Sequence, residues 1–164
     1  MKIDTARLEI RLLTAEQLAL WLHDLPRLEQ ELDCRYGAEP LAGDFRTIVE
    51  MQHAATAADP ANPQWHSFWF IVRKTDRRVV GSAIFKDLPD PEGNVEIGYG
   101  LGKDFEHNGY MSEAIEALCG WALQQAGVRH ITAETDADGF ASQRLLQKCG
   151  FREHSRAETC WWIL

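Results

Sequence analysis

The sequence predicts an α/β fold of the α+β kind, carried by one domain that spans residues 1–164. Short aromatic and β-branched runs indicate strands, and longer stretches with apolar residues every three or four positions indicate helices. The two kinds of element follow the irregular order β-α-α-β-β-β-α-β-α-β-β, which is typical of a mixed α/β domain. A chain of 164 residues buries roughly two thirds of its unfolded surface as one domain, so no second domain is expected.

The first part of the chain indicates a strand and two helices. Leu8–Leu12 alternates apolar and charged residues, as a half-buried strand does. Thr14 and Gln17 fit a capping box at the start of a helix. The apolar positions of that helix are Leu18, Leu22 and Leu25. A second helix is predicted over 44–58, before a proline-rich segment breaks the pattern. The rest of the 26–63 region carries no motif.

The remaining elements alternate between strands and helices. Residues 68–73 and 79–86 are aromatic and β-branched runs joined by a polar loop, which predicts a hairpin. An apolar stripe at helical spacing predicts a helix after Gly109, with Gly127 as its stop. The other predicted elements are strands over 95–99 and 130–134, a helix over 141–148, and terminal strands near Phe151 and over 160–164.

The loop before the third helix has the composition of a phosphate-binding turn. Gly109 at the junction lets backbone N–H groups and the positive end of the helix dipole face one anion. Two other phosphate signatures are excluded, because no Gly-x-x-x-x-Gly-Lys-Ser/Thr run exists and the glycines at 98, 100 and 102 precede the helix by too much for a dinucleotide fingerprint. Taken alone, the segment leaves an ordinary strand-to-helix turn as the alternative.

Several segments resemble one known family. Glu106-His-Asn-Gly-Tyr-Met111 is similar to the motif Gln/Arg-x-x-Gly-x-Gly/Ala, with Glu106 and Met111 as departures. Segments 5–16, 68–85 and 95–99 resemble the opening strand and helix start, the central hairpin and the fourth strand of the same family. Segment 141–151 is similar to a motif in which Asn-x-x-Ser precedes a helix ending in Gly-Phe. The family is the GNAT acetyltransferase superfamily, in the branch of the ribosomal-protein alanine N-acetyltransferases.

The resemblance implies a twisted, mostly antiparallel mixed sheet with helices on both faces. It also implies an N-acetyltransferase that moves an acetyl group from acetyl-CoA to an amine, by direct attack in a ternary complex. The acceptor would be a peptide N-terminus or a small-molecule amine. A catalytically weak or inactive acyl-CoA-binding or interaction module on the same fold is the alternative, suggested by Glu106, Met111, Gly139 and Leu146. A further alternative is an enzyme that transfers another acyl group. In it, Trp65 and Trp69 would line the acceptor pocket.

The same resemblance assigns the residues that would bind the cofactor. The backbone of the loop would hold the pyrophosphate of coenzyme A, with Ser112 as an extra donor. That loop consists of Glu106, His107, Asn108, Gly109, Tyr110 and Met111. Backbone amides near Tyr99, Gly100 and Leu101 would face the pantetheine arm and the developing oxyanion, at a strand bulge that the nearby glycines make easy. A plain twisted strand is the alternative to the bulge.

Two residues are candidates for proton transfer. Glu96 is the candidate general base, because it lies on the strand that leads to the bulge and alternates with apolar neighbours. A surface or ion-paired glutamate is its alternative, and Glu134 is the second choice of base. Ser142 stands where the family places a hydroxyl near the sulfur, and helix capping is its alternative. Leu146 occupies the position at which many members carry a tyrosine that protonates the leaving thiolate.

Charge and composition narrow the classes of partner that this chain is expected to bind. The chain carries 17 Lys+Arg against 25 Asp+Glu, a formal net charge of −8, and no long basic run, so nucleic acid is not expected as a partner. Four scattered cysteines predict a reduced, cytoplasmic protein. Neither a membrane span nor a metal site is expected. A cationic acceptor amine is expected from an acidic cluster at Glu29, Glu31, Asp33 and Glu39. The sequence leaves the oligomeric state open, a homodimer included.

Overall fold

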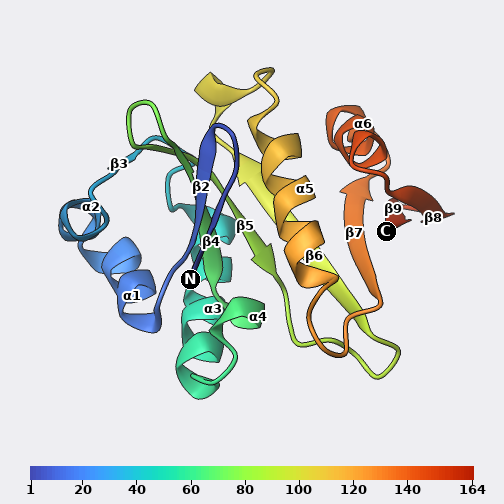
Figure 1. Cartoon of the computed structure of the whole chain (residues 1–164), viewed down its shortest axis with the longest axis horizontal. Helices are drawn as coiled ribbons and strands as arrows, with labels where there is room; N and C mark the ends of the chain where they lie inside the picture. Colours follow the sequence, from blue (N-terminus) through green and yellow to red (C-terminus); the bar gives the residue numbers. More distant parts are fainter.

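Nine strands form one twisted sheet in the computed structural model, which describes all residues 1–164 (Figure 1). Its path is β1-β2-β4-β5-β6-β7-β9-β8, with β3 beside β5. Only β6–β7 and β3–β5 pair in parallel, so the mostly antiparallel mixed sheet is confirmed. The strands are β1 (Lys2–Asp4), β2 (Leu8–Leu12), β3 (Arg35–Tyr36), β4 (Phe68–Arg73), β5 (Arg78–Phe85), β6 (Asn94–Leu101), β7 (His130–Asp136), β8 (Arg152–Arg156) and β9 (Thr159–Ile163).

Helices cover both faces of the sheet, as expected (Figure 1). One apolar core joins α5 and α6 to inward side chains such as Val95 and Ile97 of β6. The other joins α1, α2 and α3 to the opposite face, where Phe68 and Phe70 of β4 are buried. The helices are α1 (Ala15–His23), α2 (Leu25–Leu32), α3 (Gly43–Ala58), α4 (Pro63–His66), the 3-10 turn η1 (Lys103–Phe105), α5 (Tyr110–Ala122) and α6 (Phe140–Lys148). None of them combines the length and apolarity that a bilayer crossing requires.

Most helix starts were predicted correctly from local sequence signals. The errors in the predicted helix ends also have local causes. The capping box at Thr14 and Gln17 is present at the start of α1. Leu25 was expected in that helix, but α1 ends at His23 because Asp24 accepts a hydrogen bond from the amide of Arg27 and starts α2. The helix α5 ends at Ala122, before the expected stop at Gly127. The elements β1, α2, β3, α4 and η1 were not predicted.

The central feature for function is an opening between β6 and β7. These strands pair only from Asn94 to Glu96, and β7 then continues against β9. The rest of β6 pairs with β5 in unbroken register from Ile97 to Leu101. The bulge expected there is therefore absent from this pairing, and the opening arises because β6 and β7 part after Glu96. The glycines of β6 therefore do not form the bulge that the sequence analysis expected of them.

Candidate functional site

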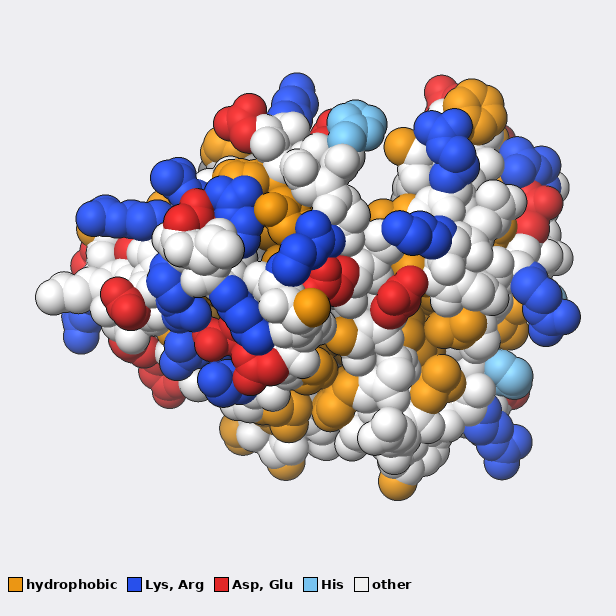
Figure 2. All heavy atoms as spheres, turned by 45° about the horizontal axis from the view of Figure 1, so that its top comes forward, with side chains coloured by type: hydrophobic (Ala, Val, Ile, Leu, Met, Phe, Trp, Pro, Cys, Tyr) orange, Lys and Arg blue, Asp and Glu red, His pale blue; other side chains and the backbone are white.

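A hollow of about 500 Å³ lies between the free end of β6, the start of α5 and α6. Figure 2 shows it as a notch in the surface with Lys and Arg side chains along it. We call it the donor hollow. Nine of the ten residues expected to bind the cofactor line it, together with Ser142. These nine are Tyr99, Gly100, Leu101, Glu106, His107, Gly109, Tyr110, Met111 and Ser112.

Asn108 is the expected residue that does not line the donor hollow. Its side-chain amide donates to the carbonyl oxygens of Phe105 and Glu106, at 3.1 and 2.9 Å, and so holds the loop in shape. Gly109 then takes φ +78°, a left-handed conformation that favours glycine, and directly precedes α5. The turn therefore presents the unbonded amides of the first turn of α5 to the hollow.

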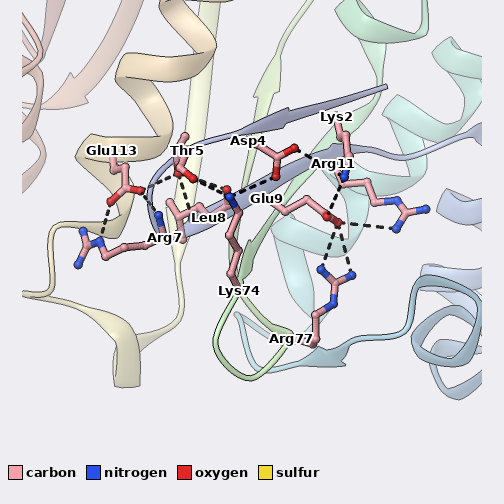
Figure 3. A network of polar contacts seen from close by, with 10 residues as sticks. All are labelled: Lys2, Asp4, Thr5, Arg7, Leu8, Glu9, Arg11, Lys74, Arg77 and Glu113. Atoms are coloured by element: carbon pink, nitrogen blue, oxygen red, sulfur yellow. Dashed lines mark hydrogen bonds and ion pairs between the residues drawn. The ribbon is translucent and has the colours of Figure 1, made fainter.

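Arg7, in the turn between β1 and β2, contacts this loop, and sequence reasoning missed it as part of the site. Its Nη1 donates to the carbonyl oxygen of Asn108 at 2.8 Å, and its Nε pairs with Glu113 at 2.7 Å. Figure 3 shows Arg7 and Thr5 both reaching Glu113, which lies in the first turn of α5. The guanidinium also stands 4.6 Å from the centre of the Tyr110 ring. The β1–β2 turn is thereby fastened to the start of α5, and a cation lies under the loop.

Two further cations face the donor hollow from α6. Arg144 and Lys148 line it one helical turn apart, and Lys148 Nζ donates to Ser112 Oγ at 3.5 Å. Ser112 Oγ itself donates to the carbonyl oxygen of Gly109 at 3.3 Å. These cations offset Glu106, whose carboxylate was expected to weaken anion binding. Their i, i+4 spacing on α6 places both on the helix face that contains Ala141 and Leu145, which also line the hollow.

The backbone of β6 offers two amides to the opening. The amides of Lys86 and Gly102 donate across the β5–β6 pair, which fixes the alternation of hydrogen bonds along β6. By that alternation the amides of Tyr99 and Leu101 point away from β5, toward the gap that β7 leaves. The amide of Gly100 points toward β5, so Gly100 lines the hollow without being the amide donor that the sequence suggested.

Ser142 and Tyr99 form a hydroxyl pair at the wall of the donor hollow. Their oxygens lie 2.6 Å apart, and either can donate. The N-terminus of α6 has no side-chain cap, so helix capping is not the role of Ser142. Burial raises the pKa of Tyr99 above its ordinary value, although the Ser142 hydrogen bond acts in the opposite direction. The pair therefore stays protonated at neutral pH and can supply a proton. Sequence reasoning found Ser142 and missed the hydroxyl of Tyr99.

A second hollow of about 470 Å³ opens on the opposite face of the sheet. We call it the acceptor hollow. Phe45, Ile48, Met51 and Gln52 of α3 form one side of it, and its floor is the paired face of β4, β5 and β6. Tyr99 and Gly100 line both hollows, so the two spaces meet at β6. Trp65 and Trp69, expected to wall an acceptor pocket, are instead buried against Trp121.

The carboxylates near the opening lie in different settings. Glu96 forms an ion pair with Lys86 and lines neither hollow. Glu134 lines a polar recess beside Ser142. Glu39 lines the acceptor hollow, and its Oε2 lies 3.8 Å from the point where a Cβ on Gly100 would stand.

The other acidic residues proposed to attract a cationic acceptor are engaged elsewhere or lie away from the hollow. Glu29 accepts from the amide of Tyr36 and Glu31 from Gln17. Asp33 ends α2. None of these three lines the acceptor hollow. Across the chain, three or more His, Cys, Asp or Glu side chains nowhere gather in a way that could hold a metal ion.

Comparison with known proteins places this chain in a family. The family model described as acetyltransferase (GNAT) domain matches residues 7–152. The N-acetyltransferase YjdG of Bacillus subtilis is 40% identical over 96 residues, which are 58% of this chain and 57% of YjdG. The N-acetyltransferase p20 of Bacillus licheniformis is 26% identical over 142 residues, 82% of this chain and 79% of p20. The chain thus spans little more than half the length of YjdG.

Solved structures share the fold at low sequence identity. The ribosomal-protein-S5-alanine acetyltransferase from Vibrio fischeri superposes with a TM-score of 0.73 and 15% identity, over 100% of this chain and 96% of that one. RimL, a ribosomal L7/L12 α-N-protein acetyltransferase solved with coenzyme A, gives a TM-score of 0.71 and 15% identity, over 100% and 97%. Both comparisons support the architecture of the sheet and helices described above.

Proposed function

Because the chain belongs to the acetyltransferase (GNAT) domain family, we propose that it is an N-acetyltransferase that moves an acetyl group from acetyl-CoA to an amine. The observation that carries the proposal is the meeting of two hollows at Tyr99 and Gly100, where β6 has parted from β7. One hollow would hold the donor and the other the amine, so both would be present at once. Direct attack in a ternary complex is the mechanism that this geometry supports.

The donor hollow has the groups that coenzyme A requires. Its phosphates would face the turn at Gly109 and the amides at the start of α5, with Arg7, Arg144 and Lys148 as counter-charges. The amides of Tyr99 and Leu101 would bond the pantetheine arm and hold the thioester oxygen as charge develops on it. Acetyl-CoA would supply the activated acetyl group.

The proton balance of the reaction assigns roles to the side chains. A C–N bond forms and the C–S bond breaks. The nitrogen loses two protons between ammonium and amide: the first passes to a base and on to solvent, and the second balances the proton that the departing thiolate receives. We assign protonation of the thiolate to Ser142, whose hydroxyl Tyr99 would orient and reprotonate. We assign the role of the base to Glu39, because it lines the acceptor hollow beside Gly100, whereas Glu96 is paired with Lys86. Glu96, chosen from the sequence, remains the competing assignment.

The wider expectations from the sequence belong to the same proposal. The acceptor would enter as a positively charged ammonium, for which Glu39 provides the counter-charge. One domain over residues 1–164 is supported by the continuous nine-stranded sheet. A reducing, cytoplasmic setting is supported by four free cysteines.

Binding and turnover test the proposal together. Acetyl-CoA should raise the melting temperature, since a ligand that binds only the folded state adds about 2.7 kcal/mol at a hundredfold excess over Kd. A panel of primary amines should then release free coenzyme A in a thiol assay. No thermal shift up to millimolar acetyl-CoA would remove the proposal. A shift without thiol release from any amine would favour the acyl-CoA-binding module instead.

A further inference from the structure

The geometry points to a small primary amine on an apolar body as the occupant of the acceptor hollow. The inference rests on the proposed function and names its substrate class. Ile48 and Met51 carry the argument, because they are 45% and 66% exposed on α3 and both line this hollow. Phe45 and Phe68 continue the apolar wall. Large apolar side chains left open in this way indicate a ligand site that buries them.

The floor of the hollow is kept open by two glycines of β6. Gly98 stands opposite Ile84, and Gly100 stands opposite Ser82. A Cβ on Gly98 would lie 3.5 Å from Ile84, and one on Gly100 would lie 3.8 Å from Glu39. Any larger side chain at either position would therefore project into the space. The purpose of these glycines is room for a ligand on the face opposite the donor hollow.

The polar groups of the hollow fit one ammonium. Ser82 is 4% exposed, lines the hollow, and its hydroxyl bonds to no protein group. This hydroxyl opens on the hollow and can accept a hydrogen bond from the N–H group of a ligand. Glu39 supplies a negative charge across Gly100. Glu39 is the only carboxylate among the residues that line the hollow, so a second positive charge on the ligand would find no counter-charge there.

The backbone around the hollow favours a small amine over a peptide. An extended peptide can be held by hydrogen bonds to an open strand edge. Here β4, β5 and β6 are paired with one another across the floor, and α3 satisfies its own backbone groups. The volume of about 470 Å³ lies in the range of small-molecule sites. The charges that line the hollow and the satisfied backbone around it both favour an amine with an alkyl or aryl body and no second charge.

Calorimetric titration of amines into the protein saturated with coenzyme A tests the inference without turnover. We expect 2-phenylethylamine to bind at least roughly tenfold more tightly than 1,4-diaminobutane or a peptide with N-terminal leucine. Ile48→Ser and Met51→Ser should each weaken its binding by roughly five- to tenfold. Leu123→Ser is the matched control, because Leu123 is 40% exposed and lies outside the hollow, and it should change nothing.

The outcomes separate the inference from the proposed function. Tighter binding of the diamine or of the peptide would overturn the inference, and so would Ile48→Ser and Met51→Ser variants that bind 2-phenylethylamine as the wild type does. The proposed function is measured apart from this, by release of coenzyme A from acetyl-CoA. If 2-phenylethylamine binds as expected but is not acetylated, the binding inference holds and the proposed function fails.

Discussion

At the scale of single residues, the site depends on a hydroxyl pair formed across 43 positions of the sequence. Tyr99 comes from β6 and Ser142 from the first turn of α6, and the opening between β6 and β7 allows them to meet. The phenol of Tyr99 is partly buried, and burial raises its pKa, so it remains an acid well into the alkaline range. A protonated relay is therefore available throughout the neutral range.

Substitution of the pair should separate chemistry from binding. Ser142→Ala should lower kcat by roughly 10²-fold and Tyr99→Phe by about tenfold, with little change in the Kd of acetyl-CoA. The double variant should be no worse than Ser142→Ala, because the two hydroxyls act as one unit. Steady-state kinetics with calorimetry of acetyl-CoA would measure this. Wild-type kcat in both single variants would show that the thiolate takes its proton from solvent.

The choice of base can be decided by a pair of isosteric substitutions. Glu39→Gln should lower kcat/KM for the amine by roughly 10²-fold, since it removes the carboxylate beside Gly100. Glu96→Gln should have a smaller effect, because Glu96 is paired with Lys86 and lines neither hollow. The opposite result, a large loss only in Glu96→Gln, would restore the assignment made from the sequence. Acetyl-CoA affinity serves as the control in both variants.

At the scale of elements, the phosphate turn is held from outside by the β1–β2 turn. Thr5 and the amide and guanidinium of Arg7 all donate to Glu113 of α5 (Figure 3). Burial acts to raise the pKa of Glu113, and the hydrogen bonds from Thr5 and Arg7 outweigh it, so the pKa lies below its usual value. The carboxylate is thus ionised at neutral pH and keeps the start of α5 in place.

Gly109 gives the sharpest test of this turn. Gly109→Val should abolish binding of acetyl-CoA, because valine strains the left-handed conformation and its Cβ would stand 3.4 Å from Arg7 Nη2. Gly127→Val is the matched control, since Gly127 has φ +83° and open space around it far along the chain. Both variants should lose similar stability, and only Gly109→Val should lose the ligand-induced thermal shift. Equal ligand-induced thermal shifts in Gly109→Val and Gly127→Val would mean that acetyl-CoA does not bind at the Gly109 turn.

The same elements show what the sequence could predict. Periodicity and the capping box located α1, α3, α5 and α6, because those signals are local. The motif around Gly109 located the donor hollow for the same reason. Arg7 and the hydroxyl of Tyr99 were missed as site residues, and Glu39 was expected only within an acidic cluster that attracts the acceptor. The reason is that their roles come from contacts between strands and loops distant in sequence. Free amides near Tyr99 and Leu101 were expected at a bulge, whereas they arise because β6 stops pairing with β7 after Glu96.

At the scale of the whole molecule, buried thiols tie folding to pH. Burial raises the pKa of Cys119 to about 12, and that of Cys34 and Cys149 to about 11. In the unfolded chain a thiol ionises near pH 8.5. The folded state therefore holds protons that the unfolded state releases, so this contribution to stability is complete below about pH 8.5 and falls as the pH rises toward 11 or 12.

Acidic groups set the other limit of the stable range. The pKa of Asp76 is lowered chiefly by its hydrogen bond with Arg73, and that of Asp90 by the amide of Asn94. Their stabilisation is present above the ordinary carboxyl pKa and is lost as the pH falls through the lowered values. The free energy of unfolding should consequently be flat between about pH 5 and 8 and decline on both sides.

The share of Cys119 in the alkaline decline can be measured. Between pH 7 and 10, ionisation of Cys119 in the unfolded chain alone should cost roughly 2 kcal/mol of the free energy of unfolding. Cys119→Ala removes this linkage, so the variant should start less stable at pH 7, because it leaves a small cavity in the α5 core, yet lose less between pH 7 and 10 than the wild type. Urea unfolding followed by tryptophan fluorescence at the two pH values measures both quantities. An identical loss in wild type and variant would mean that Cys119 does not carry the linkage, whereas slow alkylation of the native thiol at pH 8, beside rapid alkylation in urea, would independently support its burial as the cause.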